Sequence, residues 1–169
     1  AAATGILING AEKFSSIGNK KSAGTKLVCL DSFFNNPGVY EIDMGTPMKK
    51  IFNEIGGGYK EPVKAFQIGG PLGGVVPLNE IDNLNLDFQE FSSKGFMLGH
   101  ASVVSIPKDF SMTEYIHHLF EFSSEESCGK CFPGRLGSYR GKEMFDQLKK
   151  KTAKIPLKLL NELLVTMQK

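Results

Sequence analysis

The 169-residue sequence has no tryptophan and only three cysteines, Cys29, Cys128 and Cys131. Three cysteines make no even disulfide framework, so a reducing cytoplasm is the simplest compartment. No apolar run reaches membrane-spanning length, and no segment has the basic start and apolar centre of a signal peptide. We therefore expect no direct membrane insertion. The chain opens on Ala1 rather than methionine, which fits a fragment of a longer protein.

The composition is that of an ordinary globular protein, with 41% hydrophobic and 22% charged residues. The charge is unevenly distributed. Residues 1–127 hold 10 basic and 15 acidic residues, whereas residues 128–169 hold 10 and 3. A basic end can indicate nucleic acid. No nucleic-acid motif accompanies it, so we expect no such partner and favour a helical surface that faces an acidic partner or domain.

The first part of the chain predicts a helix followed by a β-hairpin. Apolar residues recur at helical spacing over residues 1–18, and residues 1–24 are expected to form an N-terminal helix and connector. Residues 25–33 are rich in β-forming residues, and residues 38–44 alternate in polarity. The two segments flank Asn-Asn-Pro-Gly, which is strong turn chemistry. Within the first strand we expect Leu27 and Cys29 to share the inner face, with Cys29 as a small buried residue.

A helix is expected next, with Thr46 as its cap and an apolar face from Met48 to Ile55. A hairpin followed by a packed helix is the opening of a β-grasp arrangement. Further β-like segments follow at residues 63–68, 75–78, 84–91 and 100–106. We therefore expect an α+β fold with a β-grasp-like domain over residues 25–108.

The glycine-dense segment 69–74 offers two interpretations. Exposed backbone N–H groups can cradle a phosphate, but the segment lacks a GKS/T ending and a clean GxGxxG pattern. A structural turn is the favoured alternative. His100 stands alone after Gly99, and we expect it to be structural.

Residues 109–169 predict a small helical module. Ser111 and Glu114 form a capping box for the first helix. His117 and His118 are adjacent, so they point in different directions, and we expect both to be exposed or to face a partner. Helical patterns then cover residues 135–151 and restart at Pro156.

Cys128 and Cys131 lie two residues apart and are the candidate metal ligands of the chain. This spacing lets both sulfurs bind one metal ion. The pair alone is a weak signal, since CxxC also occurs as half a zinc site, as a redox dithiol or by chance.

The residues around the cysteine pair resemble the signature of a known family. Residues 126–137 read ESCGKCFPGRLG, which is similar to the ESCGxCxPCRxG signature of the NADH-binding flavoprotein subunit of respiratory complex I and of related hydrogenase and formate dehydrogenase subunits. The upstream segments INGAE (8–12), GTKL (24–27), NPGVYE (36–41) and GTP (45–47) resemble that subunit's middle region, in the same order. The hairpin and helix resemble its soluble-ligand-binding β-grasp (SLBB) domain.

The resemblance implies electron transfer in a parent protein. Hydride would pass from NADH to FMN, and electrons would leave through a 4Fe–4S cluster with Cys128 and Cys131 among its ligands. Gly134 stands where the family has its third cysteine, and no later cysteine supplies the fourth. A cluster ordinarily needs four thiolates. We therefore expect this chain, as given, not to hold a stable cluster.

The resemblance also limits the activity that we expect of this chain alone. The family's FMN and NADH domain has no counterpart here, so no catalytic or cofactor-binding residue is assigned and the isolated chain is expected to be inactive. The implied partners are that FMN domain and other subunits of an NADH dehydrogenase or hydrogenase complex, in the cytoplasm or on the cytoplasmic side of a membrane-bound complex.

One alternative remains open, and a second is disfavoured. The β-grasp part can be a small-ligand or protein-docking module beside a degenerate cysteine loop. A zinc-ribbon nucleic-acid binder would need a second CxxC or a histidine pair, which the sequence lacks.

Overall fold

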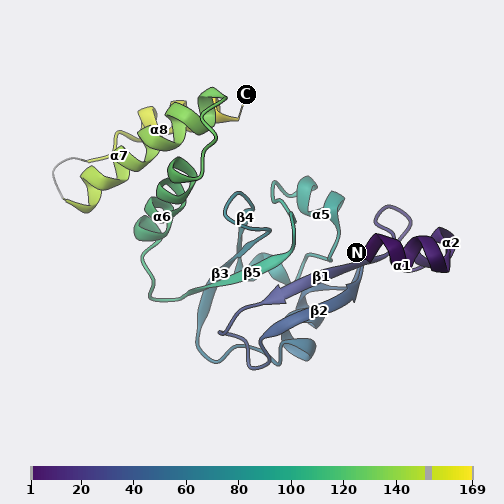
Figure 1. Cartoon of the computed structure of the whole chain (residues 1–169). Coiled ribbons are helices and arrows are strands. Elements are labelled where there is room, and N and C mark those ends of the chain that lie inside the picture. Colours follow the sequence, from purple (N-terminus) through teal and green to yellow (C-terminus); the bar gives the residue numbers. More distant parts are fainter. Residues whose placement is uncertain (1, 151–153, 169) are drawn as a thin grey trace. The chain divides into compact units, whose positions relative to one another are not determined.

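The computed structural model describes residues 2–150 and 154–168. The chain divides into two compact units, residues 1–108 and 109–169 (Figure 1). Within the described part, no helix has both the length and the apolar character needed to cross a membrane.

The first unit is built on one five-stranded sheet (Figure 1). Its strands are β1 (Thr25–Leu30), β2 (Gly38–Asp43), β3 (Val63–Ile68), β4 (Gly74–Pro77) and β5 (Ser102–Pro107). Their order is β2-β1-β5-β3-β4, with β1 and β5 parallel and the other neighbours antiparallel. The first and last strands thus lie side by side at the centre, as in a β-grasp sheet. The expected α+β class is confirmed.

The hairpin formed by β1 and β2 is confirmed, with Thr25 opposite Asp43 and Leu30 opposite Gly38. The expected inner face of β1 is wrong. Val28 and Leu30 are buried, whereas Leu27 and Cys29 are exposed. From Leu27 to Leu30 both faces of β1 are apolar, so these residues do not distinguish the faces, and pairing with β2 and β5 decides which set faces the core.

Among the described residues of this unit, six short helical segments accompany the sheet. They are α1 (Ala2–Asn9), α2 (Ala11–Ser15), α3 (Met48–Lys50), the π-helical turn η1 (Ile51–Ile55), α4 (Leu78–Ile81) and α5 (Phe88–Ser93). The helix expected over residues 1–18 is two helices, because Gly10 has a φ of 91° between them. Thr46 does not cap α3 as expected. Its hydroxyl donates to the Asp43 carbonyl at 2.8 Å, and Pro47 occupies the capping position.

The segment 84–91 is not the β-like element that its alternation suggested. Leu84 and Leu86 are buried, but α5 begins at Phe88. The Asp87 carboxylate caps α5 by accepting from the backbone N–H groups of Gln89 and Glu90 at 2.8 and 2.9 Å. A capping signal therefore outweighs a short apolar alternation here.

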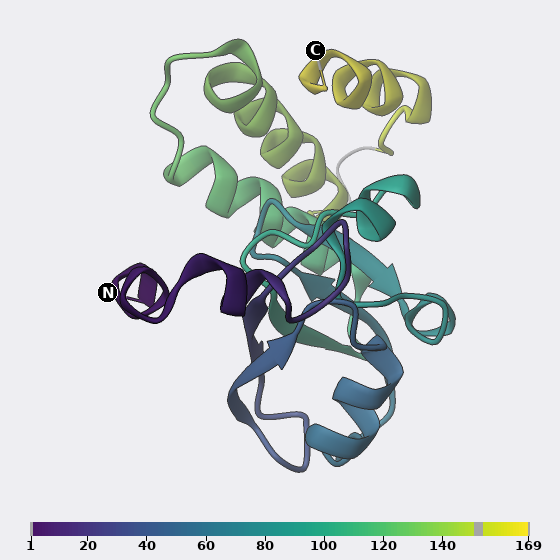
Figure 2. The same cartoon turned by 90° about the vertical axis from the view of Figure 1, so that its right-hand side faces the viewer.

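The core of this unit lies between the sheet and the α3–η1 segment, which Figure 2 shows beside the strands. Phe34, Phe52, Phe66 and Tyr59 form one aromatic cluster, in which Phe52 and Phe66 have ring centroids 4.8 Å apart. Edge-to-face and tilted contacts of this kind stabilise a core beyond the area that they bury. The cluster therefore fixes Tyr59 at the edge of the unit.

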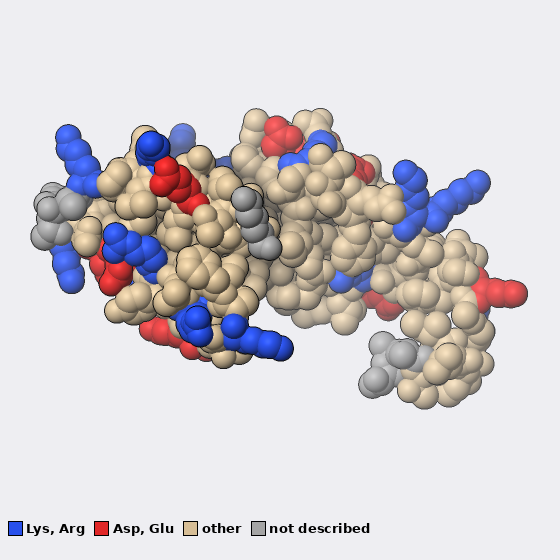
Figure 3. Space-filling view, turned by 90° about the horizontal axis from the view of Figure 1, so that it is seen from above, with Lys and Arg blue, Asp and Glu red and all other residues tan. Residues whose placement is uncertain are grey.

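The second unit consists of α6 (Met112–Glu125), the π-helical turn η2 (Pro133–Gly137), α7 (Ser138–Lys149) and α8 (Leu157–Met167). The expected cap of α6 is confirmed, because Ser111 Oγ accepts from the Glu114 N–H at 3.4 Å. The helices after the cysteine loop are confirmed too, although Lys151, the end of the expected range, lies outside the described residues. On the face shown in Figure 3, basic side chains of this unit lie among acidic ones.

Candidate functional site

The cysteine loop connects the end of α6 to η2 and lies at one end of a helical hairpin. Phe120 of α6 and Phe145 of α7 stack with ring centroids 5.7 Å apart. Gly141 lets the two helices approach, since a Cβ there would lie 2.2 Å from the Phe120 ring. The loop is therefore held by two closely packed helices.

One buried histidine also joins these helices. His117 is only 6% exposed, and its Nε2 lies 2.7 Å from Oδ1 of Asp146 on α7. The hydrogen bond to His117 is the largest cause that holds the pKa of Asp146 below its usual value. The expectation that His117 is exposed is wrong, because α7 covers it, whereas His118 is exposed.

The loop itself is shaped by local hydrogen bonds. Gly129 has a φ of 72°, a left-handed conformation that favours glycine, and its N–H donates to Ser127 Oγ at 3.2 Å. The Arg135 N–H donates to the Cys131 carbonyl at 3.0 Å. Each cysteine is therefore next to, or part of, a hydrogen-bonded backbone turn.

Gly134 faces the inside of the loop. A Cβ built on it would lie 3.7 Å from Cys131 Sγ and 2.7 Å from Ser127 Oγ. Its position in the right-handed turn η2 permits a side chain, so glycine is not required by the backbone. A side chain at position 134 would thus begin near Cys131 Sγ once Ser127 Oγ moved aside, and this chain has no thiol there.

The remaining donors do not complete a cluster site. Cys128 and Cys131 are both exposed. Within residues 2–150 and 154–168, no group of three or more His, Cys, Asp or Glu side chains could hold a metal ion. A 4Fe–4S cluster is bound by four thiolates. The residues present here therefore do not fit that group, and the assignment of Cys128 and Cys131 as metal ligands stays a prediction.

The two other positions singled out in the sequence have local structural roles. The glycine segment 69–74 is the turn between β3 and β4, where the Gly73 N–H and the Gln67 side chain both donate to the Gly70 carbonyl at 2.8 Å. His100 is exposed, and its Nδ1 accepts from the Ser102 N–H at 3.4 Å.

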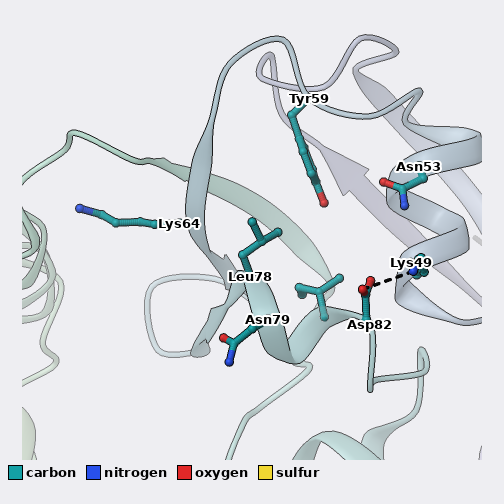
Figure 4. Close-up of a pocket in the computed structure, with 8 residues that line it drawn as sticks. Lys49, Asn53, Tyr59, Lys64, Leu78, Asn79 and Asp82 are labelled. Carbon is teal, nitrogen blue, oxygen red and sulfur yellow. Dashed lines mark hydrogen bonds and ion pairs between the residues drawn. The ribbon is translucent and has the colours of Figure 1, made fainter.

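The first unit also has a hollow of about 590 Å³ that sequence reasoning missed (Figure 4). The Tyr59 hydroxyl points into it, between Leu78 and Asn53, and Lys49 pairs with Asp82 at its edge at 3.3 Å. Burial, and then the Asp82 carboxylate, raise the pKa of Tyr59 to about 12. The hydroxyl therefore remains a hydrogen-bond donor at neutral pH.

The sequence and fold are shared with subunits of NAD-linked redox complexes. Residues 114–169 match the family described as the NADH-ubiquinone oxidoreductase-F iron-sulfur binding region. The chain is 35% identical over 147 residues to the NADP-reducing hydrogenase subunit HndC of Solidesulfovibrio fructosivorans, covering 86% of this chain and 30% of that protein. It is 36% identical over 140 residues to the mitochondrial NADH dehydrogenase (ubiquinone) flavoprotein 1 of Dictyostelium discoideum, covering 81% and 29%.

A solved structure has a similar fold. The NAD+-reducing NiFe-hydrogenase in its H2-reduced state matches with a TM-score of 0.82 and 25% identity, covering 96% of this chain and 28% of that one. The chain is thus homologous to part of the complex I flavoprotein and of its counterparts in NAD-linked hydrogenases, with their iron–sulfur binding region at its C-terminal end. It spans about 30% of the length of these relatives.

Proposed function

We propose that this chain is the β-grasp and helical scaffold of an NADH-linked flavoprotein subunit. In that parent protein hydride passes from NADH to FMN, and electrons leave through an iron–sulfur cluster. FMN and NADH bind outside residues 1–169, and other subunits of an NADH dehydrogenase or hydrogenase complex are the partners. The 35% identity to HndC over 147 residues supports this role, as does the match over 114–169. The proposed location is the cytoplasm or the cytoplasmic side of a membrane-bound complex.

The number of thiols in the cysteine loop supports a scaffold role for this chain. Two exposed thiols, with glycine at position 134, leave the loop with half the ligands of a 4Fe–4S cluster. The helical hairpin that supports the loop is nevertheless intact. The chain therefore supplies structure and contact surface to its parent protein, while the chemistry lies elsewhere.

A flavin and activity assay tests the scaffold role. The purified chain is mixed with FMN, freed of unbound flavin, and assayed for NADH oxidation with ferricyanide as acceptor. We expect no retained flavin and no oxidation above the buffer rate. One FMN retained per chain, with NADH-dependent ferricyanide reduction, would place the hydride chemistry inside these residues and contradict the proposal.

The hollow beside Tyr59 favours a second candidate function, a small-ligand module. Its volume lies within the usual range of ligand pockets, about 300–1,000 Å³. It combines an apolar wall at Leu78 with a tyrosine donor and the Lys49–Asp82 pair. Amide NMR spectra recorded with millimolar small carboxylates would test it. Saturable shifts confined to these residues, absent in Tyr59→Phe, would support the module, and unchanged spectra would exclude carboxylates as its ligands.

A further inference from the structure

One edge of the five-stranded sheet is open along β2 (Figure 1). In the described part of the chain, β2 pairs with β1 and with no other strand. The pairing runs without a register shift over all six residues of β2, so this edge has no bulge, and the strand contains no proline. The opposite edge strand, β4, has four residues and ends in Pro77. Short strands and proline protect a sheet edge from further pairing, so β2 is the edge that can accept another strand.

The direction of the backbone groups at this edge follows from the pairing of β1. The Cys29 N–H donates to the Ala101 carbonyl at 3.3 Å, so the backbone groups of Cys29 face β5 rather than β2. Val39 lies directly opposite Cys29 and therefore belongs to a non-hydrogen-bonded pair. Its N–H and C=O point away from β1, and those of Glu41, two residues further on, point the same way. Among the described residues, neither Val39 nor Glu41 has a backbone partner on that side, so both can bond to an added strand.

The side chains along this edge are acidic on one face of the sheet and apolar on the other. Glu41 and Asp43 are exposed on the outer face, and β2 contains no basic residue. The Thr25 hydroxyl donates to Glu41 at 2.6 Å and holds its carboxylate on that face. Tyr40 and Ile42 lie on the inner face, against the core. Opposite charges on neighbouring strands attract, so an added strand needs basic residues on its outer face and apolar residues on its inner face.

The same charges disfavour pairing between two copies of this chain. A two-fold contact through antiparallel β2 strands would bring Glu41 and Asp43 of one copy near the same two residues of the other. Like charges at neighbouring positions of paired strands are destabilising. A separate chain with basic side chains meets attraction where a second copy meets repulsion. The edge therefore fits a basic partner strand better than a copy of itself.

We propose that the β2 edge is a docking site for an extended, basic segment of another protein chain, which adds to the five-stranded sheet as a further strand. Val39 and Glu41 form the main-chain hydrogen bonds, and the carboxylates of Glu41 and Asp43 select basic side chains. In this mode of recognition main-chain bonds give affinity, and side chains give specificity. The inference rests on the geometry and charge of the edge, and it stands apart from the role in a flavoprotein subunit.

Hydrogen exchange of single amides, followed by NMR on the full chain, tests the edge geometry and the binding together. The probe is the peptide Lys-Val-Lys-Val-Lys, acetylated and amidated at its ends. Without peptide, we expect fast exchange at Val39 and Glu41 and slow exchange at Tyr40 and Ile42, whose amides face β1. Peptide at ~10 times its Kd should slow exchange at Val39 and Glu41 ~10-fold, because only the unoccupied edge exchanges.

Matched probes and variants separate strand pairing from charge alone. The same peptide with all its backbone nitrogens methylated keeps its charge but cannot pair with a strand, so it should give no protection. Glu41→Lys combined with Asp43→Lys should abolish protection by the lysine peptide and allow protection by Glu-Val-Glu-Val-Glu. The control Glu54→Lys combined with Glu61→Lys reverses two exposed charges elsewhere in the first unit and should change neither result.

Three results would overturn the proposal. Slow exchange at Val39 and Glu41 without peptide would show that this chain or a second copy already covers the edge. Equal protection by the methylated peptide would show attraction by charge without strand pairing. Unchanged exchange at both amides with the lysine peptide in excess would show that the edge accepts no basic strand.

Discussion

Replacing Gly141 by alanine tests how tightly the helical hairpin holds the cysteine loop. The added Cβ would lie 2.2, 2.3 and 2.7 Å from three atoms of the Phe120 ring. Ordinary carbon contacts are about 3.5–4.0 Å, so the ring or the helix must move by more than about 1 Å. Phe120 stacks on Phe145, which is itself buried, so the ring has little freedom to move away.

The expected cost follows from two opposing effects. Overpacking of a closely packed site costs about 1–3 kcal/mol. The helix preference of alanine over glycine returns up to about 1 kcal/mol. We therefore expect Gly141→Ala to lower the free energy of unfolding of the helical unit by about 1–2 kcal/mol, measured by urea denaturation with circular dichroism.

Two controls isolate the contact. Gly5→Ala in α1 places a Cβ where no atom lies within 4 Å, so it should be neutral or slightly stabilising. Phe120→Leu removes the ring, so the alanine should cost less in that background than in the native one. If Gly141→Ala were as stable as the native chain, or if Phe120→Leu brought no relief, the close packing of α6 on α7 would be wrong.

Three further predictions concern polar contacts. Burial alone would raise the pKa of Asp87, but hydrogen bonds from Asn19 and from the α5 backbone together outweigh burial and lower that pKa. The contribution of Asp87 to stability is therefore present above pH about 4 and is lost as pH falls through the lowered pKa. Asp87→Asn keeps a capping oxygen, so urea denaturation should show a smaller loss of stability below pH about 4 than in the native chain, and an unchanged acid profile would contradict this. Asp31→Ala removes the carboxylate that accepts from the Ser105 N–H at 2.6 Å and from the Ser105 hydroxyl at 3.0 Å. In the same assay this substitution should lower the free energy of unfolding by about 2–3 kcal/mol. A loss below about 0.5 kcal/mol would show that the two hydrogen bonds contribute little to stability. His117→Ala opens a cavity under α7 and should cost about 2 kcal/mol, and a neutral result would mean that the histidine is not buried there.

Local signals in the sequence were sufficient for much of the fold. The Asn-Asn-Pro-Gly turn and its flanking alternation predict the β1–β2 hairpin, because hairpin register depends on neighbouring residues. The Ser111 cap is equally local. By contrast, the inner face of β1 depends on pairing with β5, whose residues lie more than 70 positions further along the chain. A strand that is apolar on both faces gives no local indication of its orientation.

The start of α5 has a local signal in the sequence, whereas the burial of His117 and the surroundings of position 134 depend on the tertiary structure. Asp87 followed three residues later by Glu90 is a helix-start pattern, so α5 can be predicted from the sequence. His117 was not, because the choice between two adjacent histidines depends on where Asp146 of α7 lies, 29 residues away. The cysteine spacing predicted a candidate metal-binding loop, but only the structure places position 134 against Cys131.

With glycine at position 134, we expect the cysteine loop not to hold a stable 4Fe–4S cluster. The most direct measurement is anaerobic reconstitution with iron and sulfide in zinc-free buffer, followed by iron and sulfide analysis and by EPR after reduction. We predict no stable cluster on the native chain and increased iron on Gly134→Cys, whose Cβ would lie 3.7 Å from Cys131 Sγ. About four irons per native chain with a 4Fe–4S signal would contradict the claim, because it would show that ligands beyond Cys128 and Cys131 complete the site.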